Sequence, residues 1–180
     1  GSKSLMALSV TMPHKEAIYE ILDNALSSFG EIDESARVAR SVNTIAISGG
    51  RLIGSNTDGD GCCNAIEQTG VGIAGSRVVV VGAGGTARAI VATLARRGAS
   101  DVAVINRTES RAQDVIASTN VARIGTVDDI ANASILINAT SVGMGNQETP
   151  VDATRLHSAL VVLDAVYHPL ETTLLRDAKR

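Results

Sequence analysis

The sequence predicts an α/β fold that contains a doubly wound parallel sheet. Strand-like and helix-like segments alternate from residue 77 onwards, and such alternation produces parallel crossover units. With two Tyr, one Phe and no Trp, the core must consist mainly of Val, Ile, Leu and Ala, which suits strands buried on both faces. The hydrophobic share of 44% and the charged share of 19% are typical of a chain that folds into a globule.

The N-terminal segments predict a strand, a helix and a hairpin. Residues 5–10 are a short apolar run, Pro13 stiffens the turn that follows, and residues 16–22 have the apolar spacing of a helix. Gly49 and Gly50 join two strand-like runs at 42–47 and 51–55, and a Gly-Gly pair in this position indicates a hairpin.

The rest of the chain predicts alternating helices and strands. Thr57 or Asp58 is placed to cap the first of these helices. The expected helices cover residues 59–68, 86–97, 110–118 and 127–131, and the expected strands cover 77–81, 102–105, 121–124, 133–138 and 160–166.

The length predicts one complete domain and part of another. A typical domain has roughly 150 residues, whereas this chain has 180. Hairpin signals give way to β-α alternation near Thr57 and Asp58. We therefore expect a partial α/β domain at residues 1–57 and a parallel-sheet domain at residues 58–180.

A glycine-rich turn predicts a dinucleotide site in the second domain. It follows the strand 77–81, opens a helix, and consists of Gly82, Ala83, Gly84, Gly85, Thr86 and Ala87. The first glycine allows a tight turn, the second lets the backbone approach a pyrophosphate, and Ala87 lets the helix pack closely on the strand. The helix N-terminus adds amide donors and a positive dipole end. This context makes the domain Rossmann-like.

The end of the next strand predicts NADP rather than NAD. An NAD site usually carries an acidic residue about 20 residues after the glycines, where it binds the ribose hydroxyls. Here that place is taken by Asn106, Arg107 and Thr108, which would not repel a 2′-phosphate. Arg111 can add a second contact to the phosphate, and Arg88 is a candidate for stacking on the adenine.

The loop after the strand 133–138 is a candidate nicotinamide site. Ligands bind at the carboxyl ends of strands in open α/β sheets. Thr140 and Ser141 are small enough to admit a ring close to the backbone, and Met144 offers an adaptable apolar wall.

Charge and cysteine content exclude several classes of function. A net charge of −3 without a long basic run argues against binding to nucleic acid or to a membrane surface. Cys62 and Cys63 are adjacent, so they provide neither a disulfide framework nor the spacing of a zinc site, and we expect no metal. A reducing, cytoplasmic location is the default expectation, and both a monomer and a homodimer remain open.

Several motifs together resemble the shikimate dehydrogenase family. They are Ser-Val-Thr-Met-Pro-His-Lys at 9–15, Ser-Val-Asn-Thr at 41–44, Gly-Ser-Asn-Thr-Asp-Gly-Asp-Gly at 54–61, the glycine-rich turn, Asn-Arg-Thr at 106–108, Asn-Ala-Thr-Ser at 138–141, and a segment from Asp164 to Leu175. They occur in order over nearly the whole chain, which makes the resemblance far more specific than any single motif.

The resemblance implies an NADPH-dependent enzyme that reduces 3-dehydroshikimate to shikimate, with the substrate between the two domains. Matching the motifs assigns Lys15 and Asp58 to catalysis, and Thr11, Asn43 and Tyr167 to the substrate. It assigns residues 82–87 and 106–108 to the cofactor. Members of this family usually have an additional N-terminal strand and helix and a C-terminal helix, so the chain resembles a fragment that lacks both.

Ketone reduction also requires a pair such as Lys15 and Asp58 on chemical grounds. Hydride transfer places negative charge on the carbonyl oxygen, and a donor within about 3 Å must supply a proton. Each residue alone has a simpler interpretation, a solvated lysine for Lys15 and a helix cap for Asp58.

Other functions remain as alternatives. They are a quinate or shikimate dehydrogenase that uses NAD, a noncatalytic nucleotide-binding module, and another two-domain NADP enzyme such as methylenetetrahydrofolate dehydrogenase or glutamyl-tRNA reductase.

Overall fold

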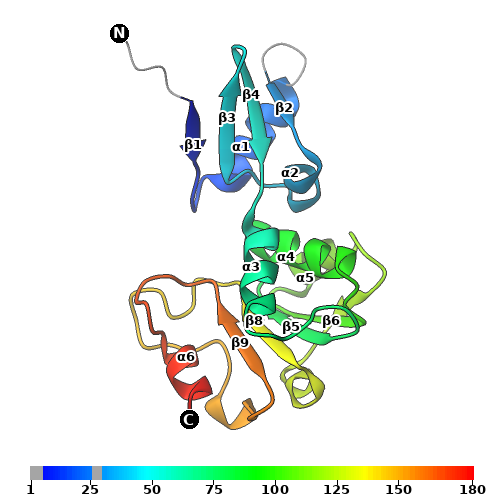
Figure 1. Ribbon diagram of the computed structural model, residues 1–180, viewed down its shortest axis with the longest axis vertical. Coiled ribbons are helices and arrows are strands. Elements are labelled where there is room, and N and C mark those ends of the chain that lie inside the picture. The colour runs from blue at the N-terminus through cyan, green and yellow to red at the C-terminus, as the bar shows by residue number, and fades with distance from the viewer. Residues whose placement is uncertain (1–5, 26–29) are drawn as a thin grey trace.

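The computed structural model describes residues 6–25 and 30–180, and it contains two separate sheets. In Figure 1 the four-stranded sheet lies at the top and the five-stranded sheet at the bottom. Helices α3 (Asp58–Glu67) and α4 (Gly85–Arg96) lie between them. The predicted boundary at residues 57 and 58 falls between the two sheets, and the division into domains at this point stays a prediction.

The four-stranded sheet has the order β1-β3-β4-β2 and confirms the predicted hairpin. Strands β3 (Thr44–Ser48) and β4 (Arg51–Ser55) are antiparallel. The turn between them needs Gly49 and Gly50, because their φ angles of 57° and 76° are unfavourable for other residues. Strand β1 (Ala7–Ser9) pairs antiparallel with β3, while Leu5, the first residue of the predicted run, lies outside the described residues.

Two short elements of this half were not predicted. Strand β2 (Gly30–Ile32) runs parallel to β4, and helix α2 (Glu34–Ala39) follows it directly. The carboxylate of Asp33 caps α2 by accepting a hydrogen bond from the amide of Ala36 at 2.9 Å. Three and six residues are too few to show a hydrophobic period, so these elements could not be recognised from spacing.

Helix α1 (Lys15–Ala25) covers one face of the four-stranded sheet and completes a small core. The buried residues of this core are Leu22, Ile32, Ala36, Val42 and Ile45. Ile21, which fits the apolar spacing of the predicted helix, is 58% exposed instead.

The five-stranded sheet is fully parallel, with the order β7-β6-β5-β8-β9, and confirms the Rossmann-like prediction. Its strands are β5 (Arg77–Val81), β6 (Asp101–Ile105), β7 (Ala122–Ile124), β8 (Ile135–Asn138) and β9 (Val161–Asp164). The predicted strands all occur, with ends that differ by two residues or fewer.

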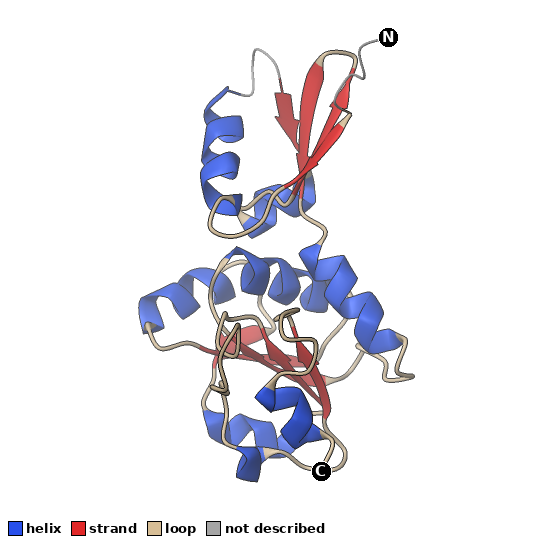
Figure 2. Ribbon diagram, turned by 90° about the vertical axis from the view of Figure 1, so that its left-hand side faces the viewer, coloured by secondary structure: helices blue, strands red, loops and turns tan. Residues whose placement is uncertain are grey.

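Both faces of this sheet are covered, as Figure 2 shows. Val78 and Val80 of β5 pack beneath α3, α4 and α5 (Glu109–Ile116). Val79 and Val81 pack on the other side, against the 3₁₀ helix Val127–Asn132 and α6 (Thr173–Ala178). Helix α6 and the short 3₁₀ helix Ala153–Arg155 were not predicted.

The two halves make direct contact where α2 meets α4. Gly59 allows α3 to approach α4, because a Cβ there would clash with the carbonyl oxygen of Ala89. Within residues 6–25 and 30–180, no helix has the length and apolar character needed to cross a bilayer.

Candidate active site

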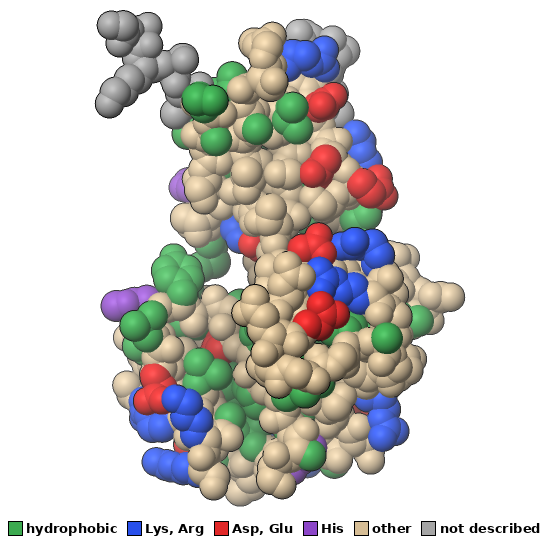
Figure 3. Space-filling model, in the orientation of Figure 1, with side chains coloured by type: hydrophobic (Ala, Val, Ile, Leu, Met, Phe, Trp, Pro, Cys, Tyr) green, Lys and Arg blue, Asp and Glu red, His purple; other side chains and the backbone are tan. Residues whose placement is uncertain are grey.

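A cleft of about 820 Å³ separates the two halves. It appears as the hollow on the left-hand side of Figure 3. The four-stranded half contributes residues that follow β1, and α3 contributes one side of its first two turns. The other half contributes the glycine-rich turn and the loops that follow β8 and β9. This is the edge of a parallel sheet at which ligands are expected.

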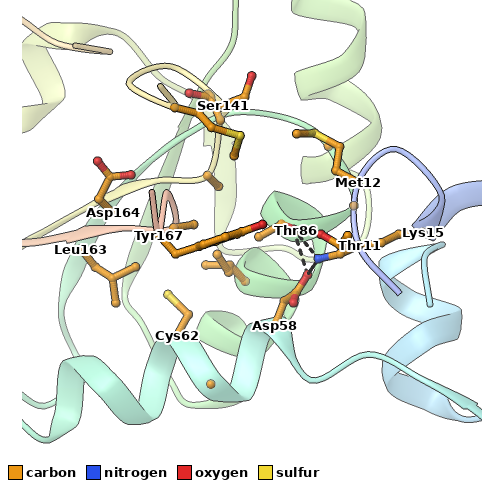
Figure 4. Close-up of a pocket in the computed structure, with 18 of the residues that line it drawn as sticks. Thr11, Met12, Lys15, Asp58, Cys62, Thr86, Ser141, Leu163, Asp164 and Tyr167 are labelled. Carbon is orange, nitrogen blue, oxygen red and sulfur yellow. Dashed lines mark hydrogen bonds and ion pairs between the residues drawn. The ribbon is translucent and has the colours of Figure 1, made fainter. Parts of the chain in front are cut away.

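Lys15 and Asp58 meet in this cleft. The Lys15 Nζ lies 2.7 Å from Asp58 Oδ2, and the two side chains are only 20% and 17% exposed. Lys15 is the first residue of α1, whereas Asp58 is the first residue of α3. Figure 4 shows both side chains pointing toward each other across the boundary between the halves. Neither simple interpretation holds, because Lys15 is not solvated and Asp58 is not the helix cap.

The turn before α3 holds Asp58 in place through two asparagines. Asn43 donates from Nδ2 to Asp58 Oδ1 at 2.7 Å and accepts from the amide of Thr57 at 3.1 Å. Asn56 accepts from the amide of Asp58 at 3.0 Å and donates to Ser41 Oγ at 2.8 Å. Asn56 and Ser41 are buried. These bonds fix the carboxylate of Asp58 from the side of the four-stranded sheet.

Thr86 holds the same carboxylate from the other half. Its hydroxyl donates to Asp58 Oδ2 at 2.8 Å, and Lys15 Nζ lies 3.4 Å from the same hydroxyl oxygen. Burial alone would raise the pKa of Asp58. Hydrogen bonds from Lys15, Thr86 and Asn43, together with the charge of Lys15, hold that pKa below its ordinary value. Asp58 is therefore a carboxylate at neutral pH.

The glycine-rich turn fits a dinucleotide. Gly82 has a φ of 121°, and a Cβ there would lie 2.9 Å from the carbonyl oxygen of Ala139, so the turn requires glycine. Gly84 is the N-cap of α4, and a Cβ on it would meet no described atom within 4 Å. No described side chain caps this helix, and its first turn contains no acidic residue. Its amides are thus available to an anion.

The sequence assigned Ala83 and Ala87 to the same site, and the structure places both in the core. Both are buried, and Ala87, in the first turn of α4, belongs to the cluster that packs this helix on the sheet, as the sequence predicted. Their small side chains let the glycine-rich turn and α4 lie close to the sheet.

Buried polar bonds shape the opposite wall of the cleft. Asn138 is fully buried, donates to Asp164 Oδ1 at 2.9 Å, and accepts from the Thr140 hydroxyl at 2.7 Å. Asp164 also accepts from the Thr172 hydroxyl at 2.6 Å. This network joins the loops after β8 and β9. It thereby places Thr140 and the nearby Tyr167 in the wall of the cleft.

Four further predicted residues line the cleft, and one does not. Thr11, Ser141, Met144 and Tyr167 are all lining residues, and Figure 4 shows the Tyr167 ring extending toward the Lys15–Asp58 pair. Asn43 is not part of the lining, because both ends of its amide bond to the turn that contains Thr57 and Asp58.

The residues assigned to the NADP phosphate lie outside the cleft lining, in the turn after β6 and in the first turn of α5. Asn106 donates to the carbonyl of Thr108 at 2.8 Å and so shapes this turn. Arg107 and Arg111 are exposed, and within residues 6–25 and 30–180 neither guanidinium has a hydrogen bond or ion pair. They remain candidates for an anionic group next to the glycine-rich turn.

Arg88 does not lie where the sequence suggested. Its Nη1 donates to the carbonyl of Ala39, at the C-terminal end of α2, at 3.1 Å. Its Nε is buried and has no hydrogen-bond partner among the described residues. Arg88 therefore links α4 to the four-stranded half, and stacking on adenine was a wrong interpretation.

One face of α3 lines the cleft, and sequence reasoning overlooked it. Gly61, Cys62 and Ala65 all contribute to the lining together with Asp58. These positions follow the i, i+3, i+4, i+7 spacing of one helix face, so the assignment of Asp58 could have revealed them. Burial raises the pKa of the Cys62 thiol to about 12, with the neighbouring Cys63 and Asp58 adding to the shift. Cys62 therefore contributes a small apolar surface to the wall of the cleft.

The described part of the chain contains no group of three His, Cys, Asp or Glu residues that could hold a metal ion.

Comparison with known proteins identifies the family. The profile of the Shikimate / quinate 5-dehydrogenase family matches residues 65–159, which is more than half of the chain. The chain belongs to this family. A shikimate dehydrogenase (NADP(+)) from Thermococcus kodakarensis is 41% identical over 99% of the chain and 64% of its own length.

Two solved structures of similar proteins share the fold. Shikimate 5-dehydrogenase from Thermus thermophilus, solved with NADP(H) and shikimate, has a TM-score of 0.83 and 32% identity over 98% of this chain and 64% of its own. The 5-ketofructose reductase of Gluconobacter sp. strain CHM43 has a TM-score of 0.78 and 37% identity over 97% of this chain and 64% of its own. The chain therefore spans a little under two thirds of the length of these relatives.

Proposed function

We propose that the protein catalyses the NADPH-dependent, reversible reduction of 3-dehydroshikimate to shikimate. The observation that carries this proposal is the 2.7 Å contact between Lys15 and Asp58 inside the cleft. The two residues come from different halves of the chain, are separated by 43 positions, and meet beside an uncapped helix N-terminus that fits a dinucleotide. The names of the relatives, which specify shikimate and NADP, support the same substrate and cofactor.

Lys15 is the proton donor in this mechanism. NADPH, when bound, supplies the hydride to the carbonyl carbon. As negative charge develops on the carbonyl oxygen, an adjacent ammonium stabilises the charge and delivers a proton. Asp58 cannot be the donor, because hydrogen bonds and the Lys15 charge keep it ionised. Its carboxylate instead orients Nζ through the 2.7 Å ion pair. In the reverse direction Lys15 acts as the neutral amine, which accepts the proton from the hydroxyl and becomes the ammonium again.

The remaining predicted residues have complementary tasks. The amides at the start of α4 are placed to bind the pyrophosphate, with Thr140, Ser141 and Met144 around the nicotinamide end. Thr11 and Tyr167 line the cleft beside the ion pair and are placed to bind hydroxyl groups of the substrate. Asn43 acts on the substrate site through Asp58, to which it donates at 2.7 Å.

A cytoplasmic location agrees with this function. Both cysteines are buried free thiols, which suits a reducing compartment.

The direct test is turnover of the full-length protein with four combinations of substrate and cofactor. Shikimate and quinate are each offered with NADP⁺ and with NAD⁺, and absorbance of the reduced nicotinamide reports the rate. We expect shikimate with NADP⁺ to give the highest kcat/KM. A preference for quinate or NAD⁺ would replace the proposal by the alternative within the same family, and no turnover in any combination would favour a noncatalytic module.

Because one neighbour in structure is a 5-ketofructose reductase, the same assay includes 5-ketofructose with NADPH. Faster turnover of this ketone than of 3-dehydroshikimate would contradict the proposed substrate while leaving the mechanism in place.

Arg107→Ala tests the choice of cofactor. The guanidinium at the end of β6 is exposed and available to a 2′-phosphate, which a bidentate contact would stabilise. We expect the KM for NADPH to rise by about tenfold, the usual effect of losing one charge-assisted contact, while the KM for NADH stays within about twofold. Arg155→Ala is the matched control, because Arg155 pairs with Asp128 on the surface and lies outside the cleft lining. An equal rise in the KM for both cofactors would contradict the assignment of Arg107 to the 2′-phosphate.

A further inference from the structure

Thr86 occupies an unusual position for a residue of a phosphate-binding turn. It is the second residue of α4, directly after the glycines that fit a pyrophosphate. Its hydroxyl is nevertheless engaged with the ion pair of the cleft, at 2.8 Å from Asp58 Oδ2 and 3.4 Å from Lys15 Nζ. Figure 4 shows Thr86, Lys15 and Asp58 converging on one point.

We propose that Thr86 is a positioning residue, which orients the Lys15 ammonium and the Asp58 carboxylate and connects them to the turn that holds the cofactor. This inference deepens the proposed function and rests on it. It changes the role that the sequence gave to Thr86, because the side chain acts on the catalytic pair and only the backbone remains for the cofactor.

The bonding capacity of the groups supports this role. A threonine hydroxyl has one proton, so a hydroxyl that donates to Asp58 cannot also donate to a phosphate oxygen. Asp58 Oδ1 already accepts from Asn43 at 2.7 Å, and Oδ2 accepts from both Lys15 and Thr86. The carboxylate is thus held by donors from both halves. With its rotation fixed in this way, it presents Oδ2 to Lys15 in one direction.

The backbone supports the connection to the cofactor. Gly84, Gly85 and Thr86 are consecutive, so a phosphate bound by the amides of this turn would fix the same backbone that carries the hydroxyl. A Cβ on Gly85 would lie 2.6 Å from Ser41 Oγ, which means that this turn is packed directly on the four-stranded half. Cofactor binding and the geometry of the ion pair therefore depend on one short segment.

Few titratable groups face this arrangement. Lys15 reaches Asp58 from α1, Cys62 lies one helical turn further along α3, and Tyr167 approaches from the loop after β9. Glu16 also lines the cleft, next to Lys15. Among these titratable groups, Lys15 is the one in direct contact with Asp58, and its hydrogen bond and charge lower the pKa of that carboxyl together with the hydrogen bonds from Thr86 and Asn43.

The test compares Thr86→Val, which keeps the shape and removes the hydroxyl, with Thr86→Ser, which keeps the hydroxyl. In the full-length protein we expect Thr86→Val to lower kcat at saturating NADPH by about tenfold or more, the usual effect of losing a hydrogen bond to a charged group. The dissociation constant for NADPH should stay within about twofold, because the backbone amides remain. Thr86→Ser should restore most of kcat. A tenfold weaker NADPH affinity with an unchanged saturated kcat would overturn the proposal, since the hydroxyl would then serve the cofactor.

A second readout is the pKa of Asp58, whose measurement by NMR does not require turnover. The Thr86 hydrogen bond lowers the pKa of Asp58, so its removal should raise the midpoint at which the Asp58 carboxyl titrates by NMR. The acid limb of kcat should move to higher pH in parallel, because Asp58 must be ionised to orient Lys15. Equal midpoints in wild type, Thr86→Val and Thr86→Ser would refute the positioning role. If the wild type does not act on shikimate but the midpoints still differ, the proposed function fails while the role of Thr86 stands.

Discussion

The two halves of the molecule differ in how completely their strands and apolar side chains are buried. In the five-stranded half, β8 is buried along its whole length, and two hydrophobic clusters cover both faces of the sheet. In the four-stranded half, all three residues of β1 are exposed, and among the described residues one cluster of five buried side chains forms the core. Its apolar side chains include Met6 and Ile21, which are 74% and 58% exposed.

This difference shows how the cleft is assembled. The parallel sheet, buried on both faces, provides the edge that carries the glycine-rich turn and the loops after β8 and β9. The four-stranded half depends on polar bonds to reach that edge, mainly those of Lys15, Asn43 and Asn56. The catalytic pair therefore lies where a well-packed region meets a thinly packed one. Three sets of substitutions test this comparison.

Lys15→Ala should have the largest effect of these substitutions. It should lower the activity and leave the fold unchanged. Removing the proton donor should reduce kcat by about 10²- to 10⁴-fold, the range for loss of a general acid or base. The KM for shikimate should change little, because Thr11 and Tyr167 remain in the cleft. The measurement is steady-state kinetics with NADP⁺, and hydrogen exchange confirms that both sheets stay folded. Lys179→Ala is the control, since Lys179 pairs with Glu171 on the surface at 2.6 Å. Undiminished turnover in Lys15→Ala would refute its role.

Leu136→Ala and Leu22→Ala should separate the two cores. Leu136 is 1% exposed in β8 and Leu22 is 3% exposed in α1, so each leaves a cavity when truncated. Leucine-to-alanine changes in a core lower the free energy of unfolding by about 2–5 kcal/mol. We expect Leu136→Ala near the upper end and Leu22→Ala near the lower end, because the sparse core around Leu22 can relax into the gap.

Amide hydrogen exchange, followed separately in β5 and in β3, shows which half each of these two substitutions destabilises. Leu22→Ala should raise exchange in β3 and leave β5 protected. Equal loss of protection in both strands would show that the two halves unfold as one unit, and the comparison would fail.

Gly59→Ala and Gly61→Ala should have smaller effects on stability, and these effects should be opposite in sign. Both glycines lie on α3, but a Cβ on Gly59 would clash with Thr93 Oγ1, whereas a Cβ on Gly61 would meet no described atom within 4 Å. We expect Gly59→Ala to lower the free energy of unfolding by about 1–3 kcal/mol through overpacking. Gly61→Ala should raise it by up to about 1 kcal/mol, because alanine favours helix. Urea unfolding measures both, and destabilisation of similar size would contradict the close approach of α3 to α4.

Sequence reasoning was most successful in the parallel-sheet half. There the β-branched runs were long enough to show strands, and the glycine-rich turn indicated the start of α4. It was less successful for short elements such as β2, α2 and α6, where three to six residues show no period. It also misplaced Arg88, because a sequence shows that a guanidinium is present but not that the carbonyl of Ala39 lies 3.1 Å away.

The amino-acid order alone determined the alternation of strands and helices, the tight glycine turn and the lack of an acidic residue at positions 106–108, because each depends on neighbours along the chain. The resemblance of the motifs indicated which residues do the chemistry. The tertiary structure decided what surrounds them: the donors and acceptors around Asp58, the α3 face that lines the cleft, and the engagement of Thr86 with the ion pair. These arrangements join positions that are tens of residues apart, and only packing of the two halves brings such positions within hydrogen-bond distance.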